Sequence, residues 1–431
     1  MEEKVFSFLA RNNLLTRQID DEKLLSFFMN EMDKGLSGQE SSLAMIPTYV
    51  SEVDKVPAGE RVIVLDAGGT NFRTCLVSFD DEGRPSMEDF RKVGMPGVKS
   101  EVSKKEFFSI LADNVERFID KCDRIGFCFS YAAKITEDHD GLPIVFSKEI
   151  KAPEVIGQPV AKCLLEELAR RGHDVSKKKY SVVNDTVATL LACKAGYREP
   201  SSGSIGFILG TGTNTAYSEK ISNIGKLGLS SQGFMIINVE SGNLDLRLGP
   251  ADESFFAMTK NPDVYHFEKM ISGAYLGPFA QHVIQLACED GVFSPEFVKR
   301  FSKIENLTTT QMSNYLEMCH NKDYVLVSCV ADNEKDACAL WLILRAVIER
   351  ASKLTAMNLS AAVLRTDAGV NPRYPVIVNA DGTTFYKTEF MLEYTKYYLH
   401  EFLEKKHGRF TKLIRIDDSP ALGAAIAGLS V

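Results

Sequence analysis

Two apolar, β-branched runs, at 62–65 and 205–209, each end in a glycine-rich turn that contains the tripeptide Gly-Thr-Asn. Short apolar runs that end in turn residues predict buried strands. A second strand-like run follows each turn, at 74–79 and 215–218. Each turn is therefore predicted to be the tip of a β-hairpin.

The two predicted tips are suited to binding phosphate. Glycine has no Cβ, so a glycine-rich tip exposes consecutive backbone N–H groups to an approaching oxygen. The first tip lies at 68–71 and the second at 210–214. Two such tips suggest a duplicated scaffold that holds one polyphosphate from both sides.

Helices and strands are predicted to alternate along the rest of the chain. The last element is predicted to be a short helix with Ser419 as its N-cap and Pro420 in its first position. This alternation predicts an α/β fold. The other predicted helices are 20–36, 103–120, 156–171, 186–195, 264–290 and 335–365, and the other predicted strands are 125–129, 180–183, 235–240 and 374–379.

The composition is that of a globular protein, because 45% of the 431 residues are hydrophobic and 25% are charged. This length is sufficient for two domains. The net charge of −8 argues against a nucleic-acid-binding protein. The sequence shows no secretory signal and no membrane span, and its nine scattered cysteines are typical of reduced thiols, so we expect a cytoplasmic protein that does not bind membranes. The sequons at Asn306 and Asn358 mean little without secretion.

The sequence lacks the commoner nucleotide signatures. It has no GxxxxGK[ST] P-loop and no protein-kinase motif set, and the glycines that begin at Gly210 do not complete a GxGxxG motif. The seven histidines do not have the spacing of metal ligands. Phosphate binding is therefore assigned to the hairpin tips.

Asp66 ends the first apolar run and has two interpretations. It can orient a water molecule bound to Mg²⁺ beside phosphate oxygens, or it can close the hairpin as an Asx-turn residue. The glycines and polar residues that follow it, 68–71, favour the functional interpretation.

Three further acids are candidates for chemistry. Asp185 lies between a predicted strand and a predicted helix, so the spacing favours an N-cap and a general base equally. Phosphoryl transfer to an alcohol needs a carboxylate that accepts the hydroxyl proton. Glu240 precedes a glycine-containing turn, from which its side chain can reach a cleft. Glu268 lies early in a predicted helix, where it can also lie on a solvated face or pair with Lys269 or His266. Each is weak evidence alone.

Taken together, these segments resemble the hexokinase family, and the resemblance covers nearly the whole chain. The order of the motifs makes a chance match very unlikely. The segments that carry it are 45–50, LDAGGTNFR at 65–73, 127–131, 146–148, VVNDTVATLLA at 182–192, GTGTNTAY at 210–217, INVESG at 237–242, 267–277 and 381–387.

The resemblance implies two actin-like (ribonuclease H-like) domains around a deep hinged cleft. The smaller domain would comprise 62–183 plus 418–431, and the larger would comprise 1–61 plus 184–417. Each domain would then carry one of the two glycine-rich hairpins.

The resemblance also implies roles for individual residues. Asp185 would be the general base, and Lys148 would act on the transferring phosphoryl group. The residues implied to contact the sugar are Ser130, Ser147, Lys148, Asn184, Asp185, Asn214, Glu240 and Glu268. Those implied to bind ATP are Asp66, Gly68, Gly69, Thr70, Asn71, Arg73, Gly210, Thr211, Gly212, Gly382 and Thr383.

The implied reaction is ATP-dependent phosphorylation of a hexose, with glucose favoured, at O6, as in the first step of glycolysis. Mg²⁺ would bind through ATP phosphates and water, with Asp66 as the nearest protein group, rather than through direct protein ligands. The partners would be the hexose and ATP, without nucleic acid or membrane, and the sequence leaves monomer and homodimer open.

Several positions depart from the family pattern, and two other functions stay open. The departures bear on rate, affinity and sugar choice more than on the reaction itself. A sugar-binding regulator with weak or no kinase activity is one alternative, and an actin- or chaperone-like ATPase is another. The departures are Ala132 for proline, Ser147 for threonine, Glu149 for glycine, Ser241 for tryptophan, Pro278 for glutamate and Pro420 for glycine.

Overall fold

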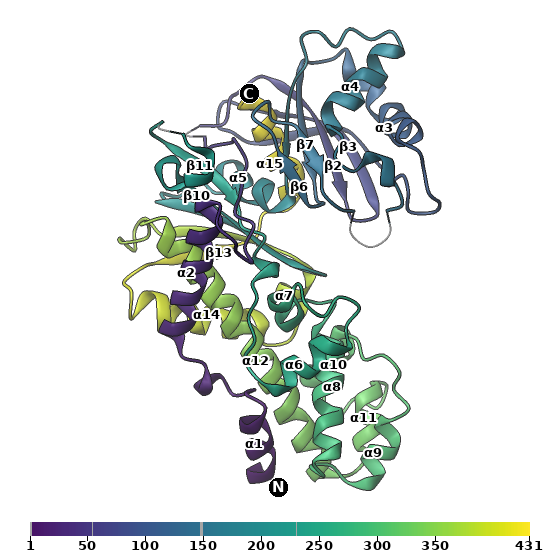
Figure 1. The fold of residues 1–431 in the computed structure, drawn as a ribbon, viewed down its shortest axis with the longest axis vertical. Coiled ribbons are helices and arrows are strands. Elements are labelled where there is room, and N and C mark those ends of the chain that lie inside the picture. Colours follow the sequence, from purple (N-terminus) through teal and green to yellow (C-terminus); the bar gives the residue numbers. More distant parts are fainter. Residues whose placement is uncertain (1, 54, 147–149, 230) are drawn as a thin grey trace.

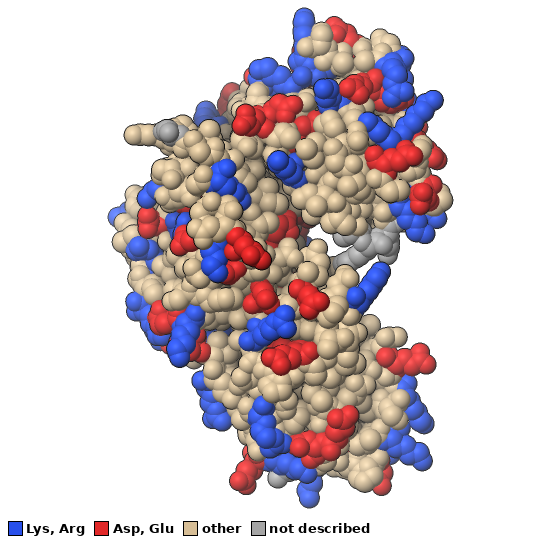
Figure 2. Space-filling model, in the orientation of Figure 1, with Lys and Arg blue, Asp and Glu red and all other residues tan. Residues whose placement is uncertain are grey.

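A computed structural model describes residues 2–53, 55–146, 150–229 and 231–431. The molecule is elongated, with two β-sheets in its upper half and a group of helices in its lower half (Figure 1). The first described helix lies at the bottom of this view and the last lies at the top, between the sheets. Acidic and basic side chains are interspersed over the face drawn in Figure 2, whose outline is hollowed between the upper and lower parts.

The first sheet has five strands in the order β4-β3-β2-β5-β8. The first three strands pair antiparallel, whereas β5 and β8 run parallel to β2. The predicted hairpin is β2 and β3. The strands are β2 (Arg61–Gly68), β3 (Asn71–Phe79), β4 (Pro85–Gly94), β5 (Arg124–Phe129) and β8 (Lys179–Val183).

The second sheet repeats this order. Its sequence β11-β10-β9-β12-β13 has the same three antiparallel strands followed by two parallel ones, and the short β1 (Ile46–Pro47) is added at the β11 edge. The duplicated scaffold predicted from the two hairpins is therefore present, and the α/β fold is that of two actin-like domains. The strands are β9 (Gly203–Leu209), β10 (Thr213–Lys220), β11 (Phe234–Asn238), β12 (Val376–Asp381) and β13 (Thr411–Ile414).

Two helices lie between the sheets, α5 (Asp185–Gly196) and α15 (Ser419–Leu429). Their small residues allow very close packing. A Cβ on Gly423 of α15 would lie 1.8 Å from the carbonyl oxygen of Ala188 in α5, and one on Gly126 of β5 would lie 1.9 Å from the carbonyl oxygen of Ala424. Any larger side chain at these glycines would force the elements apart.

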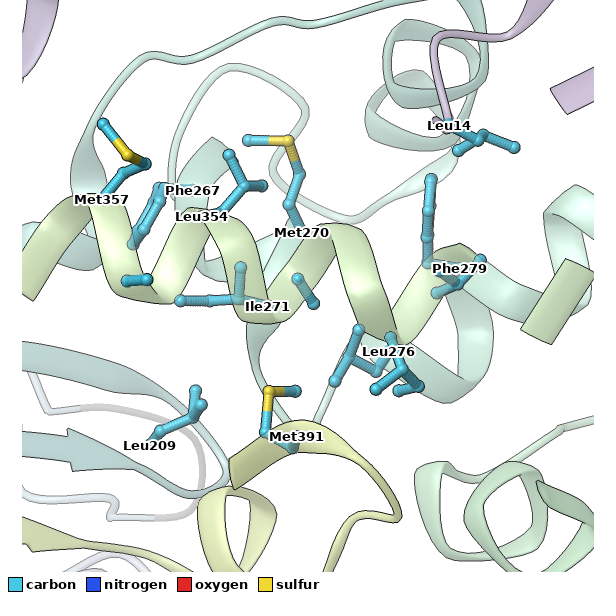
Figure 3. Close-up of a cluster of buried hydrophobic side chains, with 14 of the residues drawn as sticks. Leu14, Leu209, Phe267, Met270, Ile271, Leu276, Phe279, Leu354, Met357 and Met391 are labelled. Carbon is cyan, nitrogen blue, oxygen red and sulfur yellow. The ribbon is translucent and has the colours of Figure 1, made fainter. Parts of the chain in front are cut away.

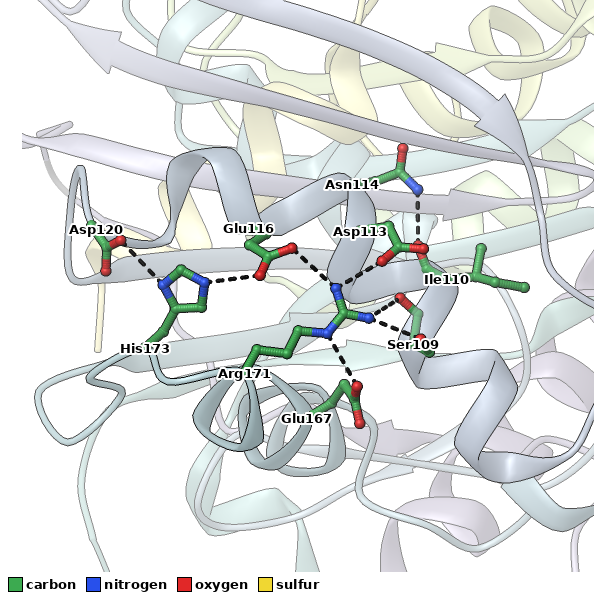
Figure 4. A network of polar contacts seen from close by, with 9 residues as sticks. All are labelled: Ser109, Ile110, Asp113, Asn114, Glu116, Asp120, Glu167, Arg171 and His173. Atoms are coloured by element: carbon green, nitrogen blue, oxygen red, sulfur yellow. Dashed lines mark hydrogen bonds and ion pairs between the residues drawn. The ribbon is translucent and has the colours of Figure 1, made fainter.

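Helices α3 (Lys104–Ile119) and α4 (Val160–Arg170) cover the other face of the first sheet and form a core with it. A polar network joins the side of α3 to the C-terminal end of α4 and the residues that follow it (Figure 4). The Arg171 guanidinium contacts Asp113 at 2.7 Å, Glu116 at 3.0 Å and Glu167 at 3.1 Å, and the His173 ring lies between Glu116 and Asp120. Glu116 raises the pKa of His173. The stability that protonated His173 gains from its acidic partners is therefore present at acidic pH. It is lost as the pH rises through the raised pKa of His173.

The long helix α12 (Glu334–Arg365) is the centre of the largest hydrophobic core. Figure 3 shows Leu354 and Met357 of this helix beside Phe267 and Met270 of α7 (His266–Ile271). The remaining helices are α1 (Glu2–Arg11), α2 (Asp21–Ser37), α6 (Pro250–Met258), α8 (Leu276–Glu289), α9 (Pro295–Phe301), α10 (Thr309–Glu317), α11 (Val325–Val330), α13 (Thr383–Lys387) and α14 (Met391–Tyr398), and the two-stranded sheet is β6 (Ala133–Ile135) with β7 (Gly141–Pro143). Among the described residues, no helix is both long and apolar enough to cross a membrane.

Two sequence predictions were wrong in detail. The predicted helix 264–290 is two helices, α7 and α8, because the chain between them turns under the second hairpin tip: Gly273 donates its N–H to the Gly210 carbonyl at 2.8 Å. The N-cap of α15 is Asp418 rather than Ser419, whose hydroxyl instead donates to the Ile416 carbonyl at 2.5 Å. Ser419 is the first residue of the helix, so Pro420 is the second rather than the predicted first.

Candidate functional site

A cavity of about 810 Å³ lies between the β2–β3–β4 side of the first sheet and the segment that joins β13 to α15. Asp66 and Arg73 line it from the first sheet, Asp381 lines it from the end of β12, and Arg415 and Asp418 line it from the joining segment. The Arg73 guanidinium contacts the Asp66 carboxylate at 2.5 Å. Burial raises the pKa of Asp66, and the Arg73 guanidinium opposes that shift.

The tip of the first hairpin is exposed and supported from behind. Gly69 has φ +55°, a left-handed conformation that favours glycine. The Tyr131 hydroxyl donates to the Gly69 carbonyl at 2.5 Å, and the Met95 N–H donates to the Thr70 carbonyl at 2.9 Å. The tip is therefore fixed through its carbonyls, while Gly68 and Asn71 close the hairpin as a strand pair.

The tip of the second hairpin is fixed in a similar way. The Gly210 carbonyl accepts hydrogen bonds from the Gly273 N–H and the Thr384 hydroxyl, both at 2.8 Å, and the Thr211 carbonyl accepts one from the Ala274 N–H at 3.1 Å. Gly212 lies directly over Glu268, since an added Cβ would meet Oε2 at 2.5 Å.

The Gly382–Thr383 turn meets this second tip. A Cβ on Gly382, which has φ +120°, would lie 2.2 Å from the Leu209 carbonyl. Thr211 and Thr383 line one cavity of about 410 Å³, together with Lys387 and hydroxyl-bearing residues of α10. The residues that were predicted to bind ATP on this side therefore lie together.

Asp185 is the first residue of α5, and Asn184, not Asp185, is the N-cap. The Asn184 side chain accepts from the Thr186 N–H at 2.9 Å, and Asp185 Oδ1 accepts from the same N–H at 2.8 Å. Burial and then the charge of Glu240 raise the pKa of Asp185 to about 7, against a lowering hydrogen bond from Ser130. A carboxyl group with this pKa can accept a proton near neutral pH.

A cluster of amides and a carboxylate lies beside Asp185. The Asn214 amide donates to Asn238 Oδ1 at 2.7 Å and to Glu240 Oε1 at 3.3 Å, and the Asn238 amide donates to Glu240 Oε1 at 2.8 Å. Burial raises the pKa of Glu240, whereas these two amides lower it. The Glu268 carboxylate accepts the Thr213 N–H at 3.0 Å, one residue before Asn214.

The structure therefore brings most of the predicted site residues into two connected groups. Ser130, Asn184, Asp185, Asn214 and Glu240 form one group, and the second hairpin tip with Glu268 and 382–383 adjoins it. Ser147 and Lys148, together with Glu149, lie outside the described residues.

Several residues that line the cavity or the amide–carboxylate cluster were not predicted from the sequence. Asn238 ends β11 and faces the Asn214 and Glu240 side chains, and its position two residues before Glu240 on a predicted strand was the available signal. Asp381 is the first residue of the segment 381–387 that carries the resemblance, and Asp418 directly precedes Ser419, the predicted N-cap of the last helix. Arg415 lies in the segment after β13 and gave no signal in the sequence, because only the tertiary fold brings this segment beside Asp66 and Arg73 at the cavity.

The described residues contain no group of three or more His, Cys, Asp and Glu side chains that could hold a metal ion. Asp66 is the carboxylate nearest the first hairpin tip, and its oxygen-donor chemistry fits a water-mediated contact with Mg²⁺.

Two family models, both described as hexokinase, match residues 11–195 and 204–430. The chain belongs to the hexokinase family. It is 30% identical to human hexokinase-3 over 82% of its own length, although it spans only 39% of that protein. It is 27% identical to the hexokinase of Schistosoma mansoni, covering 99% of this chain and 96% of the relative.

The fold is that of solved hexokinases. A structure of Schistosoma mansoni hexokinase complexed with glucose superposes with a TM-score of 0.79 at 24% identity, covering 100% of this chain and 99% of the other. A ROK hexokinase from Thermus thermophilus superposes with a TM-score of 0.54 at 16% identity, covering 85% and 97%.

The described departures from the hexokinase pattern are accommodated locally. Ser241 is fully buried and its hydroxyl lies 3.2 Å from that of Thr215, so a polar pair stands where the family has an aromatic ring. Pro278 and Pro420 both fall in the first turns of their helices, α8 and α15, where a missing N–H costs little.

Proposed function

We propose that this hexokinase-family chain transfers the γ-phosphoryl group of ATP to O6 of a hexose, with glucose the favoured sugar, and so forms the hexose 6-phosphate of the first step of glycolysis. The observation that carries the proposal is the meeting of Asp185, Ser130 and the amide–carboxylate cluster between the elements that bear the two glycine-rich tips. The family membership and the glucose complex of the Schistosoma relative support the choice of substrate.

The proposed domain division is 62–183 plus 418–431 against 1–61 plus 184–417. These boundaries lie within one residue of the start of β2, the end of β8 and the starts of α5 and α15. Movement of one sheet toward the other would then bring the two hairpin tips together and exclude water, which would otherwise accept the phosphoryl group.

In this proposal the sugar hydroxyls are held by Ser130, Asn184, Asn214, Glu240 and Glu268, and by Ser147 and Lys148 as the resemblance implies. Carboxylates and amides suit this task because each can form two hydrogen bonds to neighbouring hydroxyls. A site built to pair hydroxyls rejects analogues that lack them.

Asp185 removes the proton from the 6-hydroxyl as the O6 atom of the sugar attacks the γ-phosphorus in line. The bond between the γ-phosphorus and the β–γ bridging oxygen breaks, ADP leaves with that oxygen, and the Asp185 carboxyl group at the N-terminus of α5 holds the proton. The backbone N–H groups of the tips at Gly68–Asn71 and Gly210–Gly212 orient the phosphates, and Arg73 adds positive charge. Mg²⁺ that arrives with ATP would supply charge neutralisation beside Asp66.

The first test of the proposal is a substrate panel. Glucose, mannose and fructose are each combined with ATP, GTP or pyrophosphate as the donor. The product of each donor (ADP, GDP or phosphate) is then measured. We expect turnover that requires a hexose, with ATP as donor. Hydrolysis of ATP at the same rate without sugar would instead favour an actin-like ATPase.

The activity is expected to fall in acid because Asp185 must be deprotonated to act as a base. With a pKa of about 7, kcat/KM for the hexose should drop tenfold per pH unit well below pH 7 and level off above it. Initial rates between pH 5 and 9 at low sugar concentration give the profile. A flat profile down to pH 5 would exclude Asp185 as the titrating base.

Asn238 is expected to tune sugar affinity. Substitution Asn238→Ala removes the amide that donates to Glu240 and the oxygen that accepts from the Asn214 amide, at a cost of about 1–3 kcal/mol. The hexose KM should therefore rise about tenfold or more while kcat changes little. Steady-state kinetics measures both parameters, and an unaltered KM would show that the two amide contacts do not preorganise the site.

A further inference from the structure

We propose that Asn358, in the middle of helix α12, is a positioning residue for Glu240 and acts through a buried relay of Thr215 and Ser241; this inference rests on the proposed function. Asn358 belongs to a glycosylation sequon, but its side chain is only 3% exposed and faces the protein interior. A buried side chain of this kind acts through contacts inside the molecule.

The relay consists of a buried amide and two buried hydroxyls in series. The Asn358 amide donates to the Thr215 hydroxyl oxygen at 2.7 Å, and that oxygen lies 3.2 Å from the Ser241 hydroxyl oxygen. Thr215 and Ser241 are both fully buried. A buried polar group without a hydrogen-bond partner lowers the stability of the fold. The amide and the two hydroxyls therefore hold one another in position.

The far end of the relay is the turn that holds Glu240. Glu240 has φ +58°, a left-handed conformation that is strained for a residue with a side chain. The following residue, Ser241, anchors that turn twice, by its hydroxyl to Thr215 and by its N–H to Asn214 Oδ1 at 3.4 Å. The same Asn214 oxygen accepts the Thr215 N–H at 2.7 Å.

The relay therefore joins helix α12 to the sugar-binding cluster. Loss of the Asn358 amide would leave the Thr215–Ser241 pair without its fixed donor and allow the Glu240 turn to relax. Ser241 stands where the family has tryptophan, so a polar anchor fixed from α12 takes the place of an aromatic support at this turn.

The test uses isosteric substitutions in the full-length protein. Asn358→Leu removes the donor and Thr215→Val removes the central hydroxyl, each with little change in volume. Ser360→Ala is the matched control, because Ser360 is equally buried on α12 but its hydroxyl donates only to the Ala356 carbonyl of its own helix. Glucose affinity is measured by calorimetry and KM and kcat by steady-state turnover.

We expect Asn358→Leu and Thr215→Val each to raise the glucose Kd and KM about tenfold with kcat within twofold of the unsubstituted protein, and Ser360→Ala to change neither. The double substitution should be no worse than either single one, because both break the same relay. Unchanged Kd in both single variants, additive effects, or a loss confined to kcat would overturn the relay while leaving the proposed function intact. If the unsubstituted protein neither binds glucose nor turns over, the proposed function itself fails, and the relay with it.

Discussion

Substitution Asp185→Asn is expected to lower kcat for hexose phosphorylation by about 10²- to 10⁴-fold, the range typical of a lost general base. The amide keeps the size of the side chain and cannot take the 6-hydroxyl proton. Sugar binding should be largely retained, because Asn184, Asn214 and Glu240 are untouched. Assays that are sampled over a long time course measure the residual turnover, and calorimetry measures the glucose affinity.

The same variant supplies its own folding control. The folded-state pKa of Asp185 is raised above its ordinary value of 3.8 to about 7, so the ionised carboxylate opposes folding. This cost grows as the pH rises from about 4 to 7 and is fully present above pH 7. Asp185→Asn should therefore have a higher Tm than the unsubstituted protein at pH 8, with a gain that shrinks toward pH 5. A Tm that falls at pH 8 would mean that the lost activity reflects misfolding, and near-normal kcat would remove Asp185 from the mechanism.

Substitution Gly423→Ala is expected to destabilise the protein by about 3 kcal/mol or more, at the upper end of the range for overpacking a core. The new methyl group would lie 1.8 Å from the backbone carbonyl oxygen of Ala188, which cannot move aside as a flexible side chain could. Helices α5 and α15 would have to separate. Because α5 begins with Asp185, activity should also fall. Urea denaturation measures the loss of stability.

The control for this prediction is Gly203→Ala in β9. An added Cβ there would lie 3.5 Å from the Ala368 Cβ, an ordinary contact. This variant should keep the urea midpoint of the unsubstituted protein. Equal midpoints for Gly423→Ala and Gly203→Ala would contradict the close crossing of α5 and α15.

Sequence alone was enough for the features that depend on local chemistry. The two hairpins follow from apolar runs that end in glycine-rich turns, and both were confirmed as β2–β3 and β9–β10. The alternation of elements gave the α/β class. For Asp185, the local pattern could not separate an N-cap from a base, and the structure shows that Asn184 takes the capping position.

The remaining features depend on contacts between distant segments. The break between α7 and α8 exists because Gly273 pairs with Gly210, and no local signal at 264–290 contains that contact. The Asn358 amide meets Thr215 across 143 positions of sequence, and the helical pattern of α12 gives no reason to single it out. The contact of Asn238 with Asn214 could not be predicted either, because only the pairing of β10 with β11 brings these two residues together.

The most direct test of the central claim is ³¹P NMR of a reaction that contains the protein, Mg²⁺, ATP and glucose. The account predicts that the γ-phosphate resonance is replaced by that of glucose 6-phosphate, whose phosphorus couples to the two protons on C6, in equal amount to ADP, and that Asp185→Asn forms it far more slowly. Inorganic phosphate in place of the sugar phosphate, or no turnover although calorimetry shows glucose bound, would contradict it.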